Sequence, residues 1–450
     1  MILVVARRLS IVGIFMLYLW PRYFFIPVAG KGVSGFTFFA LFLLPVAMMA
    51  LLSSTERLKS FASSIAQSKA VLGLFVLWWA WRLGCDYVGV SPERSFGITI
   101  LDFGYLGVWT ITGAILFADR KLRSALPYII LFSGIIATIF GLIELSTGST
   151  LTNTLGFSSF AVGDEYMLRD INSTLMRGTM VRIRSLYSHP LVYGQILASM
   201  SPVAIHFLLQ SKKLSKLLGV ILGACIVVSI SICNARSPYF VAFSGSAVYF
   251  ALYFLDPKSG TKMFILLWAV LTFLVVAPVA TGAFFQVASG RTSEEAMSSS
   301  ARDRQMEQGT RALMSRSITG YGDGNAASIA STRGIQSAPS VDNYYLSTAV
   351  DSGYSGAIIL IVFLFAATLK GARLSYREPD PTARSIHAVC VGMVVALAAG
   401  LVILSITDTL SIIFLATGYF VAASSRRVGS RTITRGRRNL DAISVPFARG

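Results

Sequence analysis

Long apolar stretches alternate with short polar connections along almost the whole chain. An α-helix needs about 20 mainly apolar residues to cross the hydrocarbon of a bilayer. Stretches that approach this length lie at residues 10–26, 34–52, 70–86, 97–118, 125–147, 188–210, 214–233, 237–255, 262–285, 344–369, 386–404 and 408–424. The pattern therefore predicts an all-α, polytopic integral membrane protein with about twelve transmembrane helices.

Two long polar segments interrupt this pattern, Leu151–Tyr187 and Gln286–Asn343. They predict a division of the chain into residues 1–147 (helices 1–5), 148–187 (first outer segment), 188–285 (helices 6–9), 286–343 (second outer segment, with an amphipathic helix), 344–424 (helices 10–12) and 425–450 (basic tail). Because the apolar helices read as a scaffold, we expect the chemistry to lie in the two outer segments.

Composition and charge agree with a membrane protein and predict its orientation. Hydrophobic residues make up 54% of the chain and charged residues 13%, and the mean hydropathy is +0.67. Alternate connections, together with a tail that carries seven arginines, hold 24 of the 39 lysines and arginines. Positive connections stay cytoplasmic, so both termini are predicted to be cytoplasmic and both outer segments periplasmic. Anionic membrane lipids, rather than nucleic acid, are the expected partners of the tail.

Several classes of function receive no support from the sequence. The four cysteines lie in or beside apolar stretches without metal-ligand spacing, so we interpret them as packing residues. No phosphate-binding Walker loop, HExxH motif or Rossmann glycine pattern is present, which argues against an ATP-driven pump or a metalloprotease. No internal repeat is evident, which disfavours a transporter built from inverted halves. We therefore predict neither a metal nor a cofactor.

Arginine, with almost no lysine, is the basic residue of the outer segments. The first segment ends with Arg182, Arg184 and His189 before an apolar helix, and Arg236 lies in the next outer turn. Arginine can bind two oxygens of a diphosphate at once, whereas lysine offers one hydrated point charge. His189 has two interpretations, a site residue or the start of a helix ahead of Pro190. Arg236 has a second interpretation too, as a structural partner of an acidic residue such as Glu144 or Asp164.

The second outer segment contains a predicted amphipathic helix over Ala301–Leu313. Helical spacing would place one arginine on a face with three other residues, namely Arg302, Met306, Gly309 and Leu313. A turn with Gly320 and Gly322 follows, and such a turn allows the backbone to approach a ligand closely. The segment ends with Asp342 and Asn343, ahead of the glycines at 353 and 356.

At these residues the chain resembles the O-antigen ligase and O-antigen/exopolysaccharide polymerase superfamily of bacterial inner-membrane glycosyltransferases. The resemblance covers roughly Arg177 to Gly356. Its most specific element is the ligase pattern His-[Asn/Ser/Gln]-x9-Gly-x-x-[Gly/Thr/Tyr], met here by Asn343, Gly353 and Gly356 with Asp342 in place of the histidine. The other matching elements are an arginine about eighteen residues before a Gly-x-Gly turn, an "Arg…His-Pro" start of a helix and a "Ser/Asn-x-Arg-Ser" turn, met by Arg302 with Gly320 and Gly322, by Arg182 with His189 and Pro190, and by Arg236.

The resemblance implies transfer of an oligosaccharide from undecaprenyl diphosphate to a glycan or lipid acceptor at the periplasmic face, without a nucleotide sugar. It gives the role of catalytic base to Asp342, and His189 is the other candidate. An equally open interpretation makes Asp342 the cap of the following helix. The aspartate favours a polymerase of lipid-linked repeat units, for which a chain-length regulator is a further candidate partner. The alternatives are an O-antigen ligase and, in another class, a transporter or flippase for the same lipid.

Overall fold

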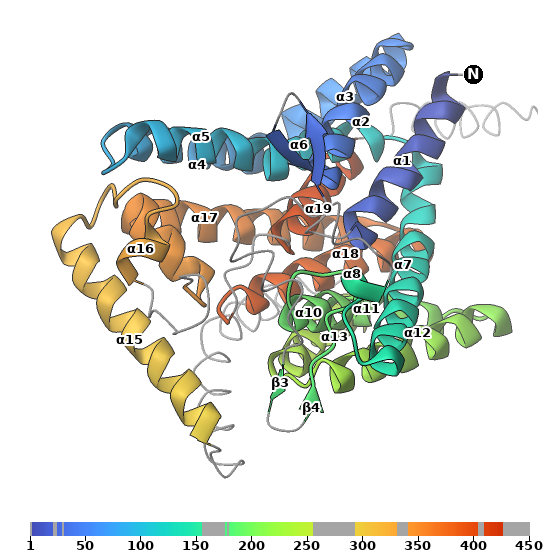
Figure 1. The fold of residues 1–450 in the computed structure, drawn as a ribbon. Helices are drawn as coiled ribbons and strands as arrows, with labels where there is room; N and C mark the ends of the chain where they lie inside the picture. Colours follow the sequence, from blue (N-terminus) through green and yellow to red (C-terminus); the bar gives the residue numbers. More distant parts are fainter. Residues whose placement is uncertain are drawn as a thin grey trace, which may run out of the picture.

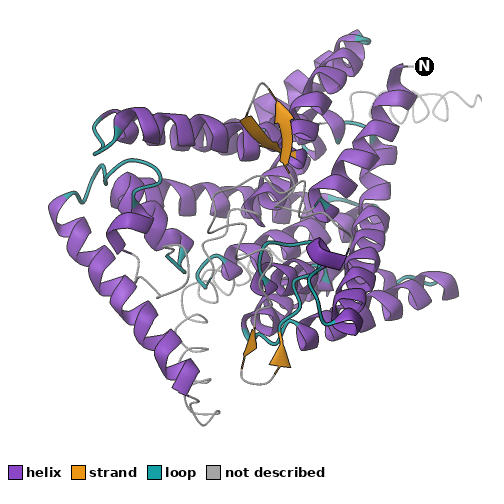
Figure 2. Ribbon diagram, viewed as in Figure 1, coloured by secondary structure: helices purple, strands orange, loops and turns teal. Residues whose placement is uncertain are grey.

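The computed structural model describes residues 2–20, 25–28, 31–154, 176–177, 180–254, 293–330, 341–403 and 409–425. Apart from two short antiparallel hairpins, the secondary structure is helical throughout this part of the chain (Figures 1 and 2). The predicted ninth helix, 262–285, and the basic tail beyond residue 425 lie outside the described residues.

The described chain forms helices, two short hairpins and one π-helical turn. Their bounds are α1 (Ile2–Leu19), β1 (Phe25–Val28), β2 (Lys31–Ser34), α2 (Gly35–Leu52), α3 (Thr55–Gln67), α4 (Lys69–Tyr87), α5 (Pro92–Asp102), the π-helical turn η1 (Phe103–Gly107), α6 (Val108–Leu116), α7 (Arg120–Thr147), α8 (Leu151–Thr154), β3 (Met176–Arg177), β4 (Met180–Val181), α10 (Pro190–Ser199), α11 (Ser201–Leu208), α12 (Lys213–Ile232), α13 (Ser237–Phe254), α15 (Ser293–Ser315), α16 (Ala326–Ala330), α17 (Tyr344–Arg377), α18 (Pro381–Gly400) and α19 (Leu410–Ala423).

Within the described residues, six helices are long and apolar enough to cross a membrane, or up to seven if the bent pair α2 and α3 counts as one. They are Pro92–Leu116, Arg120–Thr147, Pro190–Leu208, Lys213–Ile232, Tyr344–Arg377 and Pro381–Gly400. The prediction of an all-α membrane protein is therefore confirmed in its coarse form. The prediction of twelve transmembrane helices is not confirmed, because α19, for example, is an apolar helix of only 14 residues.

Two predicted helices have different courses from those expected. The stretch 34–52 forms α2, but the chain then bends by 114° into α3 instead of ending in a loop. The stretch 344–369 forms α17, which continues to Arg377 and is broken at Gly353, where φ is 72° and ψ is 173°. The periodicity of apolar residues reports which face of a helix is buried, and neither a bend nor a break changes that periodicity.

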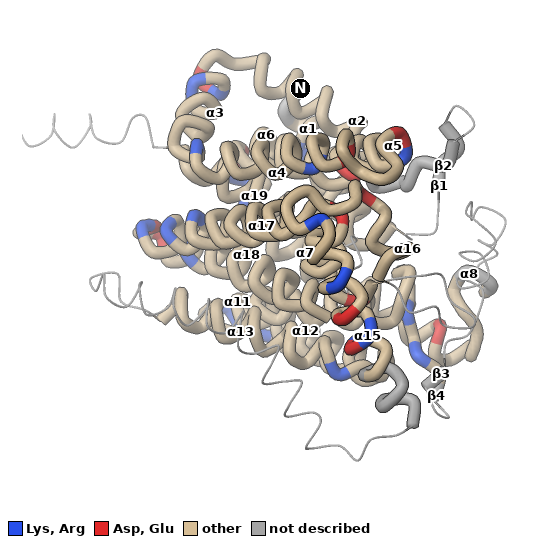
Figure 3. Tube along the Cα trace, turned by 90° about the vertical axis from the view of Figure 1, so that its left-hand side faces the viewer, with Lys and Arg blue, Asp and Glu red and all other residues tan. Residues whose placement is uncertain are grey.

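Contacts between distant residues show which helix ends lie together. At one end the Arg7 guanidinium pairs with Asp119 (Nε–Oδ2 2.7 Å), and the Lys370 ammonium donates to the carbonyl of Gln67 (2.7 Å). At the other end the amide of Ile183 donates to the carbonyl of Ile232 (3.2 Å). Charged residues gather mostly near the two ends of the helices (Figure 3). This grouping agrees with the predicted alternation of inner and outer connections.

The described part of the second outer segment packs as one body at the end of the helices that we predict to face outward. Helices α15 and α16 and the start of α17 share a small apolar cluster of their own, formed by Leu313, Ala326, Ala330, Val341, Leu346, Ala349, Val350 and Ala357. In Figure 1, α15 is the long helix that runs down the left-hand side, away from α17. The predicted amphipathic helix is present, but Met306 is half exposed, and Gln305 takes its place on the face with Gly309 and Leu313.

Candidate functional site

The end of the first outer segment lies against the outer ends of α7 and α12. The Arg182 guanidinium donates from Nε to the carbonyl of Cys233 (3.3 Å), and Ser185 holds a left-handed conformation with φ 54°. Arg236 follows Cys233 closely, in the turn where Asn234 has φ 48° before α13 begins. Arg182 and Arg236, two of the arginines expected to bind diphosphate, thus belong to neighbouring stretches of backbone.

Arg184 is buried, with 2% of its surface exposed, and interacts electrostatically with Glu144. Glu144 also accepts a hydrogen bond from the amide of Ser185 (2.6 Å to Oε2). Glu144 was a candidate partner of Arg236, and these contacts connect it to the first outer segment. The other candidate, Asp164, lies outside the described residues. Because Arg184 is buried and lies close enough to Glu144 to interact with it, we interpret this arginine as a structural residue.

His189 is the N-cap of α10. Its Nδ1 accepts a hydrogen bond from the amide of Leu191 (3.1 Å), and Pro190 occupies the first helical position. Burial lowers the pKa of the imidazole to about 4, and the charges of Arg182 and Arg184 act in the same direction. His189 is therefore neutral at neutral pH and a weak proton acceptor. The geometry favours the helix-start interpretation over the catalytic one.

Arg302 and Asp342 contact each other, although they were predicted to have different roles. We call them the second arginine group; the first is Arg182 and Arg184 with the turn that carries Arg236. Arg302, on α15, pairs with the Asp342 carboxylate (Nε–Oδ2 3.1 Å), and the side chains are 46% and 36% exposed. The amide of Asp342 donates to Oε1 of Gln305, one turn further along α15 (3.0 Å). Arg302, the residue expected to bind the diphosphate, and Asp342, the candidate base, thus lie side by side, and solvent reaches both.

Asn343, not Asp342, caps α17. Its Oδ1 accepts from the amides of Tyr345 (2.9 Å) and Leu346 (3.1 Å). The cap interpretation of Asp342 is therefore wrong by one residue, because either an aspartate or an asparagine can cap a helix and the sequence presents both in succession. The Asp342 carboxylate lies outside the helix and pairs with Arg302 instead.

The glycine motifs form one structural unit. The break at Gly353 separates a short half-helix, residues 344–352, from the rest of α17, and a Cβ on Gly353 would overlap the carbonyl of Ile318. Gly320 and Gly322 belong to the turn that fits against this break, and the amide of Gly322 donates to the carbonyl of Asp351 (2.8 Å). At Gly356 a Cβ would overlap the side chain of Ser352, just before the break, and would lie 3.3 Å from Trp81 of α4. The turn was expected to approach a ligand, and in the structure Gly320 lies against the backbone of Asp351 and Gly322 against the side chain of Ser95.

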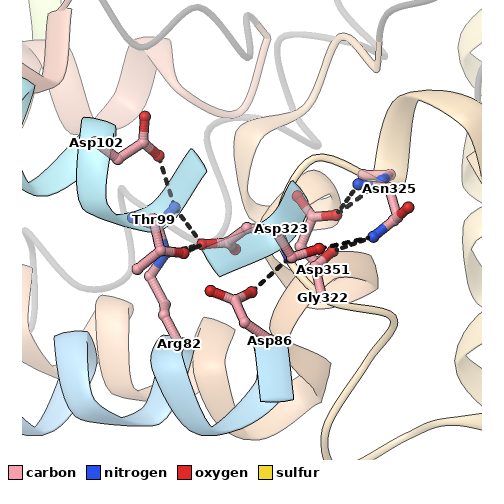
Figure 4. Close-up of polar contacts among 10 residues, drawn as sticks. Arg82, Asp86, Thr99, Asp102, Gly322, Asp323, Asn325 and Asp351 are labelled. Atoms are coloured by element: carbon pink, nitrogen blue, oxygen red, sulfur yellow. Dashed lines mark hydrogen bonds and ion pairs between the residues drawn. The ribbon is translucent and has the colours of Figure 1, made fainter. Parts of the chain in front are cut away.

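A buried ionic cluster lies where the same turn meets α4 and α5 (Figure 4). Arg82, which is 5% exposed, donates to Asp323 (Nε–Oδ2 2.7 Å) and to Asp102 (Nη2–Oδ2 2.6 Å), and the Thr99 hydroxyl donates to the same oxygen of Asp323. The carboxylate of Asp86 accepts the amide of Asp323 (2.8 Å). None of these residues was predicted to belong to the site. The available signal was an arginine and two aspartates within apolar stretches, since ionisable residues inside membrane helices are expensive to bury and usually functional.

The helices that follow the two arginine groups, α10 and α17, both contact the C-terminal end of α18. Gln195 of α10 donates to the carbonyl of Gly400 (3.5 Å). The amide of Tyr344 in α17 donates to the carbonyl of Leu401 (2.9 Å). The first group, carried by 182–189 and the turn before α13, and the second group, Arg302 with Asp342, therefore share one end of the helix assembly. We predict that Arg182, Arg236 and Arg302 reach one cavity there, because a single diphosphate needs several donors.

Within the residues that the structure describes, no group of three or more histidine, cysteine, aspartate or glutamate side chains could hold a metal ion. Neither a protein-family model nor a curated protein matches this chain.

Proposed function

We propose that the protein is a membrane glycosyltransferase that polymerises undecaprenyl-diphosphate-linked repeat units of a surface polysaccharide or exopolysaccharide at the periplasmic face. The observation that carries the proposal is the exposed Arg302–Asp342 pair, 3.1 Å between Nε and Oδ2. In this pair, Arg302 can bind two oxygens of an anion and Asp342 can accept a proton. Both lie at the predicted outer end of the helices, beside the membrane in which a lipid-linked donor would reside.

The transfer needs two kinds of group, and the outer end supplies both. The acceptor hydroxyl oxygen forms a bond to the anomeric carbon of the donor sugar while the bond from that carbon to the phosphate oxygen breaks. Negative charge then develops on the departing diphosphate, where a preplaced guanidinium stabilises it. The proton of the hydroxyl passes to a base, the role that we assign to Asp342.

The exposure of the Arg302–Asp342 pair gives it a further part in this mechanism. An ion pair that is open to solvent contributes only about 0–1 kcal/mol, so an arriving diphosphate can displace the carboxylate from Arg302. Binding of the donor would then release Asp342 to accept the acceptor's proton. The two events would occur in the order that productive transfer requires.

The same geometry fits a ligase that moves a finished glycan from the same carrier onto lipid A-core or another acceptor. The aspartate at position 342, where the ligase pattern has histidine, favours the polymerase. A transporter or flippase for the same lipid remains the alternative of another class.

The three functions give different glycans when the gene is deleted. Loss of a polymerase leaves single repeat units attached to the acceptor, whereas loss of a ligase leaves long chains on the carrier lipid. Loss of a flippase traps unpolymerised units on the inner leaflet. Sizing of the surface glycan and of the carrier-linked glycan from the deletion strain therefore tests the proposal, and long carrier-linked chains would contradict it.

A further inference from the structure

We propose that Arg82 is a positioning residue for the transfer site, because through Asp323 it fastens the second outer segment to α4 and α5 and so sets the place of Asp342 and Arg302. The catalytic part of this inference rests on the function proposed above. The fastening itself does not.

Asp323 is held firmly by the buried guanidinium of Arg82. The arginine is buried in α4, with its guanidinium carbon 4.9 Å from the ring centroids of both Trp78 and Trp79. Asp323, 4% exposed, is bound by the Nε and the Nη2 of this guanidinium at 2.7 and 2.6 Å. Removing one partner of a buried ion pair is strongly destabilising, since an uncompensated charge remains in the interior. Asp323 therefore has one strongly favoured location.

The turn that contains Asp323 is connected to the half-helix 344–352. The turn forms hydrogen bonds to the half-helix both before and after Asp323. Before it, the amide of Tyr321 donates to the carbonyl of Val350 (3.0 Å). After it, the amides of Asn325 and Ala326 donate to Oδ1 of Asp351 (3.0 and 2.7 Å). These bonds satisfy backbone and side-chain groups near the break in α17, which would otherwise be buried without partners. Turn and half-helix consequently move together.

The half-helix is in turn connected to the proposed base. Because α17 is broken at Gly353, the direction of the half-helix is set by its contacts with the turn and with α18 rather than by the long helix that follows. Asn343 caps the half-helix, and Asp342 directly precedes the cap. A displacement at Asp323 would thus be transmitted to Asp342.

The same displacement would separate the two arginine groups. Helix α15, which carries Arg302, packs on α16 and on the half-helix through their shared apolar cluster. The first group, with Arg182, is attached to α12. A misplacement of about 1 Å between reacting groups can lower a rate about 100-fold, so the Arg82–Asp323 pair is in a position to control turnover without touching substrate.

The cluster offers a matched pair of variants. Asp323 and Asp102 both accept hydrogen bonds from Arg82, but only Asp323 belongs to the second outer segment. Spin labels on cysteines at the exposed positions Gln308 of α15 and Ser231 of α12, in a background with Cys225 replaced by alanine, report the distance between the two groups.

For Asp323→Asn we expect a longer or broader 308–231 distance, together with a kcat for glycan transfer lowered about 10- to 100-fold and a KM within about threefold of wild type. For Asp102→Asn we expect an unchanged distance and a kcat within about threefold. An unchanged distance in Asp323→Asn would overturn the fastening, and a changed distance with normal kcat would overturn the positioning role.

If Asp323→Asn does not fold, Thr99→Val is expected to give smaller changes in the same direction, and wild-type distance and kcat in that variant would overturn the proposal. If wild-type protein transfers no glycan, the proposed function fails, while the distances still decide whether Arg82 fastens the segment.

Discussion

Arg302 and Asp342 are 40 residues apart in the chain and form an ion pair of 3.1 Å between Nε and Oδ2. If Arg302 binds a diphosphate, Arg302→Lys should lower the rate of transfer about tenfold to 100-fold, because the charge remains and the bidentate geometry is lost. Arg311→Lys is the matched control, since Arg311 lies on the same helix and pairs only locally with Glu307 (2.5 Å) among the contacts described. Equal activities of the two variants, measured as glycan product per folded protein, would remove Arg302 from the site.

His189 should influence acid stability rather than catalysis. Its folded-state pKa is about 4, below the ordinary value of about 6.5, so between these pH values the unfolded chain binds a proton that the folded protein does not. Stability is therefore expected to fall as the pH falls from about 6.5 to about 4. His189→Asn keeps a capping side chain. Its melting temperature should therefore fall less than that of wild type as the pH is lowered over this interval.

The same His189→Asn variant should retain transfer activity within about threefold at neutral pH, since the imidazole that it replaces is a weak base there. Melting curves in detergent at several pH values, with wild type measured in parallel, test the stability part. A variant that is folded and inactive would return the role of base to His189.

Gly353 should tolerate no side chain. Its φ of 72° is one that residues other than glycine rarely adopt, and a Cβ would overlap the carbonyl of Ile318. Gly353→Ala is expected to lose at least about 2 kcal/mol of stability. Gly73→Ala in α4 is the control, because a Cβ at Gly73 meets nothing within 4 Å. Thermal unfolding of both variants in detergent provides the comparison, and similar melting temperatures would show that the break in α17 is not required.

The predicted topology places both termini and the Lys212–Lys216 connection in the cytoplasm. The contacts Arg7–Asp119 and Lys370–Gln67 group the predicted inner connections at one end of the helices. Fusions of a periplasm-active reporter at Gln210 and Arg435 should therefore be inactive, and a fusion at Thr310 should be active. An active reporter at Arg435 would reverse the orientation and move both arginine groups to the cytoplasmic side.

Much of the fold was predictable because hydrophobic stretches and helix-terminal residues leave direct traces in a sequence. Pro190 marked the start of α10, and the stretch 125–147 ends at the same residue as α7, Thr147. The bend between α2 and α3 was not predictable, because the polar residues that follow Leu52 read equally well as a loop.

The candidate site was predictable in its residue types and only partly in its contacts. Arginine enrichment singled out Arg182 and Arg302, but no spacing rule indicates that Arg302 meets Asp342 across 40 residues. The Arg82 cluster was missed because its partners lie in three separate elements, and a single sequence records no pairing between them. Asp342 and Asn343 were confused as caps because both residue types suit the position.

The most direct test of the proposed function uses purified protein in liposomes with carrier-linked repeat units isolated from the deletion strain, and without nucleotide sugar. The measurement is the release of undecaprenyl diphosphate together with the length of the carrier-linked glycan, by mass spectrometry. Wild-type protein should release the carrier and lengthen the glycan, and Asp342→Asn should do so about 10²–10⁴-fold more slowly while remaining folded, since Asn343 still caps α17. No release by wild-type protein, or equal rates for wild type and Asp342→Asn, would contradict the account.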